Sequence, residues 1–168
     1  MAQIHEKLVE EWLRRQRYFT IRSAKFGVSE IDLLAMSVDH NGKITRRHVE
    51  VQISFRPVGF ITGKSAKKRT KEETENEVDL WMLKKFQTTE VVRLRNTTVG
   101  IGSDTDQASW QFDFVHHIVR DPYELELMRK KGINTIAFDQ IKEDLRKSEG
   151  RFSFMSDADD MVSLLKMK

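Results

Sequence analysis

The sequence contains no cysteine, and only two prolines and eight glycines occur among its 168 residues. The absence of cysteine excludes a disulfide framework, a thiolate nucleophile and any metal centre that needs sulfur ligands. The scarcity of proline and glycine excludes collagen-like and low-complexity classes. A chain of this length and composition favours one globular domain with its own hydrophobic core.

Long apolar runs and a strong excess of one charge are also missing. No stretch approaches the ~20 apolar residues of a membrane helix, and acidic residues interrupt the first 15 positions. We therefore expect neither a membrane anchor nor a signal peptide, and predict a cytoplasmic protein. The 29 basic and 26 acidic residues leave a net charge of +3, which permits a polyanionic partner without requiring one.

Hydrophobic periodicity divides the chain into alternating helices and strands. Strands are expected at residues 18–22, 29–38, 48–55, 110–119 and 133–138, and helices at 3–17, 64–86, 122–131, 139–147 and 156–166. The segment 90–106 is ambiguous between a strand and a loop. This order predicts an α/β fold with a mixed central sheet flanked by helices, in which residues 3–120 form the core and 121–168 a C-terminal α/β extension.

Carboxylates lie inside two of the expected strands. Asp32 is surrounded by apolar residues, and Glu50 and Gln52 alternate with the apolar residues of 49–53. Charged side chains in such strands are costly unless they are paired or bound to a cation. We therefore predict that Asp32 and Glu50 share a site for a divalent cation; the alternative is that both lie on an exposed face of the sheet.

The hairpin between the second and third strands determines whether these two acids meet. A two-residue turn at Asn41 and Gly42 would place Asp32 opposite Val51, with its side chain on the wrong face. A three-residue loop at 40–42 would set Asp32 opposite Glu50, and it needs a left-handed residue where Gly42 stands. We predict the three-residue loop.

Two segments, SEIDLLA at 29–35 and HVEVQ at 48–52, follow a helix with IHEKL and a strand with YFTIR. Together they resemble the PD-(D/E)XK nuclease superfamily, and in particular its small resolvase-like members. The resemblance implies a restriction-endonuclease-like αβββαβ core and Mg²⁺-dependent hydrolysis of DNA, with Mn²⁺ as a substitute ion. It also implies specific metal ligands and a helix acid beside the metal: Asp32, Glu50 and the Val51 carbonyl as ligands, and Glu6 as the acid.

Position 52 departs from this superfamily, which usually has lysine where this chain has Gln52. Glutamine can orient a water but brings no charge. A lysine from elsewhere would have to supply it, and the basic residues after the third strand are the expected donors and phosphate contacts: Lys64, Lys67, Lys68, Arg69 and Lys71. Glu30 shares a strand face with Asp32 and is a secondary candidate.

Two functions stay open at this point. One is a Mg²⁺-dependent deoxyribonuclease whose catalytic residues are Glu6, Asp32, Glu50 and Gln52. The other, favoured by Gln52, is a weak or inactive nuclease-fold module that binds nucleic acid or protein within a larger defence, repair or mobile-element assembly. The C-terminal half is expected to supply contacts for a homodimer or a protein partner. The five histidines show no metal-ligand spacing, and His48 is expected only to border the site.

Overall fold

A computed structural model describes residues 2–56, 59–63, 68–101 and 110–147. Its elements, in chain order, are α1 (Ala2–Arg15), β1 (Phe19–Phe26), β2 (Ser29–Val38), β3 (Ile44–Gln52), α2 (Lys71–Met82), the π-helical turn η1 (Leu83–Gln87), α3 (Thr89–Thr98), β4 (Trp110–His116), α4 (Pro122–Lys130), β5 (Ile133–Ala137) and α5 (Phe138–Lys147). The helix expected at 156–166 lies outside the described residues. Among the helices within them, none combines the length and apolar character needed to cross a membrane.

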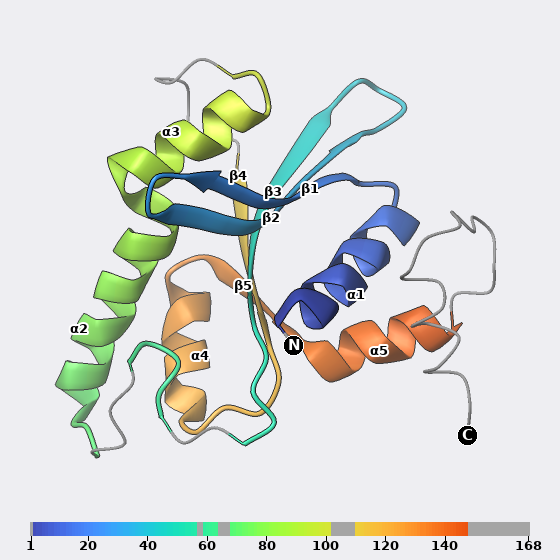
Figure 1. The fold of residues 1–168 in the computed structure, drawn as a ribbon. Coiled ribbons are helices and arrows are strands. Elements are labelled where there is room, and N and C mark those ends of the chain that lie inside the picture. The colour runs from blue at the N-terminus through green and yellow to red at the C-terminus, as the bar shows by residue number, and fades with distance from the viewer. Residues whose placement is uncertain (1, 57–58, 64–67, 102–109, 148–168) are drawn as a thin grey trace.

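In the described chain, five strands form one mixed sheet in sequence order, β1-β2-β3-β4-β5. The first three strands pair antiparallel through hairpins, whereas β3–β4 and β4–β5 pair in parallel after helical crossovers. Helices α1 and α5 cover one face of the sheet, and α2, α3 and α4 cover the other (Figure 1). The predicted α/β class, with a mixed sheet flanked by helices, is confirmed.

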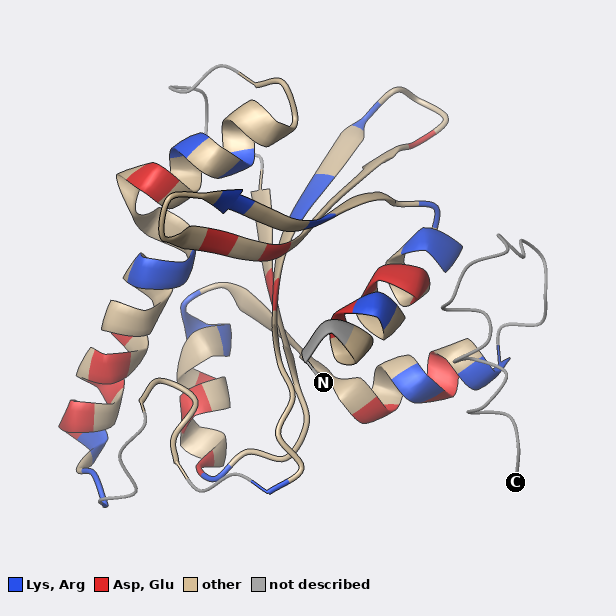
Figure 2. Cartoon of the chain, viewed as in Figure 1, with Lys and Arg blue, Asp and Glu red and all other residues tan. Residues whose placement is uncertain are grey.

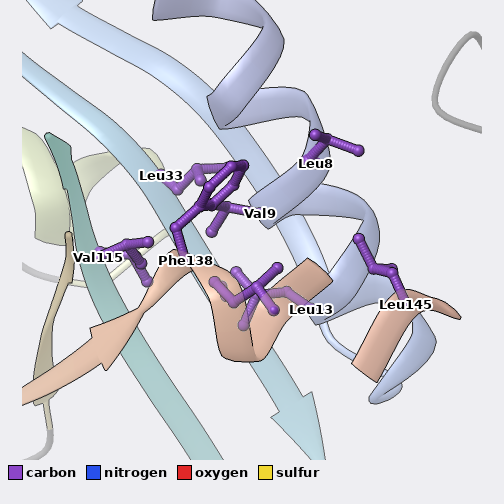
Figure 3. Close-up of a cluster of buried hydrophobic side chains, with 10 residues drawn as sticks. Leu8, Val9, Leu13, Leu33, Val115, Phe138 and Leu145 are labelled. Atoms are coloured by element: carbon purple, nitrogen blue, oxygen red, sulfur yellow. The ribbon is translucent and has the colours of Figure 1, made fainter. Parts of the chain in front are cut away.

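The face under α1 and α5 carries a mainly aliphatic core (Figure 3). Val9 and Leu13 of α1 pack with Leu33 of β2, Val49 of β3 and Leu145 of α5, and all five are fully buried. Each such side chain contributes about 1.5–3 kcal/mol relative to an exposed one. Because α1 and α5 share this cluster, the two ends of the described chain are joined through the core.

The opposite face of the sheet is more aromatic. Trp81 of α2 packs edge-on against Phe86 of η1, with ring centroids 5.7 Å apart, and against Phe114 of β4 at 5.1 Å. Trp110 and Trp81 are both buried, as expected for core anchors. This aromatic layer lies next to the polar residues of β3, so it forms the wall of the site described below.

Helix α3 covers the first part of the segment 90–106, which the sequence leaves ambiguous; residues 102–106 lie outside the described part of the chain. Thr88 caps the helix by accepting a hydrogen bond from the Val91 N–H at 3.4 Å. Val91 and Leu94 then pack against Ile31 and Leu34 of β2. The β-branched residues at 91 and 92 favour a strand locally, but burial of one helix face against the sheet outweighs that preference.

Several boundaries also differ from the expected ones: β1 runs on to Phe26 rather than ending at residue 22, and β4 ends at His116 rather than at residue 119. Helix α2 begins at Lys71 rather than at residue 64, because Thr70 and Glu73 form a capping box there. Strand β3 runs over Ile44–Gln52 rather than 48–55, so it pairs with β2 directly after the hairpin loop. These differences move the ends of elements and leave the order of the predicted elements unchanged.

Candidate active site

The site lies where β2 and β3 separate. The Asp39 N–H donates to the Lys43 carbonyl at 3.0 Å and closes a three-residue loop at 40–42, in which Gly42 has a φ of 78° and donates to the Asp39 carbonyl at 3.0 Å. Pairing then runs from Val38 opposite Ile44 to Leu33 opposite Val49, where it ends. Asp32 and Glu50 occupy the next position of this register, so the predicted loop and register are confirmed. Beyond it, β2 continues beside β1 and β3 beside β4 (Figure 1), and we call this divergence the fork.

Asp32 interrupts the regular pairing on both sides of its strand. The β1–β2 ladder skips Ser23 and Asp32, and Ser23 has a φ of 55°, an unfavourable conformation for a residue with a side chain. On the other side, the Oδ2 of Asp32 accepts a hydrogen bond from the Val51 N–H at 2.8 Å. The Asp32 carboxylate therefore accepts the hydrogen bond of the Val51 N–H, for which β2 offers no backbone acceptor beyond the end of the β2–β3 pairing.

A cavity of about 470 Å³ opens at the fork, and we call it the acidic cavity. Four carboxylates from three elements line it: Glu6 of α1, Glu30 and Asp32 of β2, and Glu50 of β3. Val51 and Gln52 line it as well, so the structure brings the predicted catalytic residues and the secondary candidate together. Glu50 is only 2% exposed, which contradicts the alternative of an exposed polar face for this residue. The chemical roles of these groups stay predictions.

Burial and mutual repulsion shape the titration of these acids. Burial, aided by the nearby Glu50 charge, raises the pKa of Asp32 to about 6, although the Val51 hydrogen bond and Lys85 oppose the rise. Burial also raises the pKa of Glu50 against the attraction of Lys85. Burial together with Asp32 raises the pKa of Glu6. Carboxylates held in this way in a cavity are typical of functional sites, because the fold gains nothing from their charge.

Lys85 brings the positive charge that position 52 lacks. It belongs to η1, lines the acidic cavity, and its ammonium forms an ion pair with the carboxylate of Glu50. In Figure 2, which colours the chain by charge, acidic segments of β2 lie beside the basic turn η1 that follows α2. π-Helical turns recur at functional sites, since the widened turn changes which residues face the neighbouring strand. The sequence contains no signal that places Lys85 here.

The basic cluster expected to supply this charge lies elsewhere. Lys71 begins α2, roughly 20 Å along the helix from Lys85, and its ammonium sits 5.7 Å from the Tyr123 ring centroid. Lys68 precedes it and is exposed, and neither residue lines the acidic cavity. Arg69 donates to the Thr62 hydroxyl at 2.9 Å. Lys64 and Lys67 lie outside the described residues.

A buried row of polar side chains holds Glu50 from behind. Arg95 donates through Nη1 to His48 Nδ1 at 3.2 Å. Because arginine only donates, we assign the imidazole hydrogen to Nε2, which then donates to Glu50 Oε1 at 3.1 Å. Burial, Arg95 and Lys85 lower the His48 pKa well below its usual range, so the ring is neutral. Both oxygens of Glu50 are thereby occupied, one by His48 and the other by Lys85.

Hard divalent cations suit the donors at the fork. Carboxylate and backbone carbonyl oxygens are the ligands that Mg²⁺ and Mn²⁺ prefer. In a strand the N–H and C=O of one residue point to the same side, so the Val51 carbonyl faces the fork together with its N–H. The described residues hold no group of three or more His, Asp or Glu side chains arranged to bind an ion by themselves. Mg²⁺ is commonly bound by one or two carboxylates and keeps several of its waters. Asp32 and Glu50 are enough carboxylates for such a site.

Comparisons with known proteins give little beyond this geometry. No protein-family model matches the chain, and no curated protein matches it. Among solved structures, the chain is similar to the crystal structure of a protein of unknown function, AF1548, with a TM-score of 0.48 and 12% sequence identity, over 99% of this chain and 79% of that one. The function must therefore be inferred from the site itself.

Proposed function

We propose that the protein is a metal-dependent nuclease of the PD-(D/E)XK type that hydrolyses phosphodiester bonds of DNA. The observation that supports this is the meeting of Asp32, Glu50 and the Val51 backbone at the fork, with the Lys85 ammonium beside them. Asp32, Glu50 and the Val51 carbonyl would hold Mg²⁺, or Mn²⁺ in its place. The bound ion would supply a water of lowered pKa and neutralise charge at the phosphorus.

The remaining cavity residues have roles that follow from their charge and position. Lys85 offers a point charge to a phosphate oxygen, which is the contribution that Gln52 lacks. Glu6 approaches from α1, and its raised pKa suits a group that accepts a proton from water. The Gln52 amide donates to the Ile61 carbonyl at 3.4 Å, which ties the end of β3 to the following loop.

A cleavage assay tests the proposal directly. Purified protein is incubated with plasmid, linear, single-stranded and branched DNA in the presence of Mg²⁺ or Mn²⁺. We expect cleavage that chelation abolishes, and a loss of about 10²-fold or more in Asp32→Asn and Glu50→Gln. Glu126→Gln removes an exposed carboxylate from α4 outside the acidic cavity and should cleave like the parent. Undiminished cleavage by both site variants would overturn the assignment.

A second candidate is a module with the same fold that binds nucleic acid or protein without cutting. One observation favours it: both oxygens of Glu50 already have partners, Lys85 and His48. This candidate predicts binding of DNA in EDTA, no metal-dependent product, and unchanged binding in Glu50→Gln. Running the binding and cleavage assays on the same preparations separates the two.

Location and assembly complete the proposal. The cysteine-free sequence suits a reducing compartment, and we place the protein in the cytoplasm. We also propose that the C-terminal half contacts a second copy or a partner protein. Size-exclusion chromatography with light scattering measures self-association, and a mass that stays monomeric at high concentration would count against a homodimer.

A further inference from the structure

A second cavity, of about 580 Å³, adjoins the acidic one and shares Gln52, Trp81 and Lys85 with it. Its charged lining within the described residues is entirely basic, consisting of Lys84, Lys85 and Arg120. We call it the basic cavity. The whole chain carries a net charge of only +3. Lys85 is paired with Glu50 of the acidic cavity, so Lys84 and Arg120 supply the further positive charge of a lining that holds no acid.

One wall of the basic cavity is the loop at 59–63, which a buried carboxylate holds in place. Glu124 of α4 is fully buried and accepts hydrogen bonds from the Ile61 N–H at 2.9 Å, the Thr62 N–H at 3.0 Å and the Thr62 hydroxyl at 2.7 Å. Arg69 adds a bond to Thr62 and lies over the Phe60 ring, 4.2 Å from its centroid. The wall is therefore ordered before any ligand binds, which lowers the entropic cost of binding.

The cations of this cavity are suited to phosphate. Lys84 is exposed and has no ion pair among the described residues. The Arg120 guanidinium lies over the Phe60 ring, 5.1 Å from its centroid, an arrangement that fixes the plane of its donors. The aromatic residues of the lining, Phe60 and Trp81, are 9% and 8% exposed, so neither offers an open ring face for base stacking.

We propose that the basic cavity binds a backbone phosphate of DNA adjacent to the phosphate that enters the acidic cavity. Lys84 and Arg120 contact this neighbouring phosphate, and Lys85 lies between the two positions. The inference rests on the proposed function for the place of the reacting phosphate, whereas the binding step itself needs no cleavage. Contacts to phosphate carry no sequence information, so recognition here depends on charge rather than on base identity.

Fluorescence anisotropy with a short labelled duplex of mixed sequence, in EDTA, measures binding alone. Lys84→Gln and Arg120→Gln should each weaken binding and reduce the slope of log affinity against log salt by about 0.9. The double variant should lose about twice as much. Arg120→Lys keeps the charge and should restore most of the slope. Lys43→Gln, at the far end of the β2–β3 hairpin, removes one exposed cation as a control and should bind like the parent.

The outcomes separate this inference from the nuclease proposal. Parental affinity and slope in both Lys84→Gln and Arg120→Gln would overturn it, as would a parent protein that does not bind the duplex. Inorganic phosphate should displace the duplex better than chloride does at equal ionic strength, because free and backbone phosphate would compete for the same cations; equal displacement by the two anions would count against a phosphate site. If the protein does not cut DNA but binds it through Lys84 and Arg120, the nuclease proposal fails and the phosphate site stands. If it cuts DNA but both variants bind like the parent, the phosphate site is rejected and the nuclease proposal stands.

Discussion

The backbone N–H of Val51 donates to Oδ2 of Asp32 across the fork, at 2.8 Å. The Asp32 side chain thus accepts a hydrogen bond that a backbone carbonyl of the neighbouring strand accepts elsewhere in β3. Burial beside Glu50 raises the pKa of this half-buried carboxylate to about 6, although the Val51 hydrogen bond opposes the rise. An uncharged acceptor such as asparagine would satisfy the same N–H without that cost, and local conflicts of this kind concentrate at functional sites.

Asp32→Asn should therefore make the fold more stable at neutral pH. The folded pKa, about 6, lies above the ordinary value of 3.8, so the folded chain binds a proton more tightly than the unfolded chain does. Ionisation of Asp32 then costs stability as the pH rises from about 4 to about 6, and the full cost persists above that range. We expect the variant to gain about 1–2 kcal/mol in the free energy of unfolding at about pH 8, and nothing near pH 4.

Urea unfolding of both proteins across this pH range measures the difference. Glu126→Gln removes an exposed carboxylate without a buried environment and should stay within about 0.5 kcal/mol of the parent at every pH. An Asp32→Asn protein that is less stable than the parent at pH 8 would mean that the charge itself holds the fork together.

His48→Phe tests the row that supports Glu50. Phenylalanine matches the ring, which already packs 4.7 Å from the Phe86 ring centroid, but it removes the donor to Glu50 and the acceptor for Arg95. Two buried charged groups lose a partner, and we expect a loss of about 2–4 kcal/mol in the free energy of unfolding. Thermal and urea unfolding measure it. His40→Phe, at an exposed loop position, is the matched control, and an equal effect there would contradict the role of the row.

Glu124→Gln should loosen the wall of the basic cavity. The carboxylate accepts three hydrogen bonds, from the Ile61 N–H on Oε2 and from the Thr62 N–H and hydroxyl on Oε1, whereas the amide would turn its N–H₂ toward one of these backbone N–H donors. We expect a loss of about 1–3 kcal/mol in stability, and faster hydrogen exchange at the amides of 61 and 62 than at other protected positions. Exchange that accelerates uniformly over the chain would show that Glu124 supports the whole fold rather than this loop.

The part of the site that the sequence predicts depends on local rules. Strict alternation places Glu50 in a strand, and the left-handed preference of glycine at Gly42 selects the loop length that sets Asp32 opposite it. Both rules act over a few residues, so they are readable without knowing the tertiary structure. The same holds for α4, expected from residue 122: Asp121 caps this helix and Pro122 is its first residue.

Other parts of the site depend on contacts between distant segments. Lys85 lies 35 positions from Glu50, and its charge within an amphipathic helix looks like an ordinary solvated face. Arg95 lies 47 positions from His48, in a segment whose β-branched residues favour a strand. Nothing local distinguishes a buried arginine from an exposed one. The density of the basic cluster near Lys68 favours it as a source of positive charge for the site. The capping box at Thr70 nevertheless starts α2 there, so this cluster lies far from the fork.

Lys85→Gln separates two roles that this residue has at the fork. Its ammonium pairs with Glu50 and so competes with a metal ion for the same carboxylate, whereas during cleavage it would offer charge to the phosphate. We therefore expect Mn²⁺ to bind more tightly to the variant in calorimetry, while DNA cleavage falls by about 10²-fold. Lys85→Arg should keep part of the activity. Lys84→Gln, one residue away and outside the acidic cavity, should leave Mn²⁺ affinity unchanged. If Mn²⁺ affinity and cleavage both fell in Lys85→Gln, Lys85 would act by holding Glu50 in position and not as a competing cation.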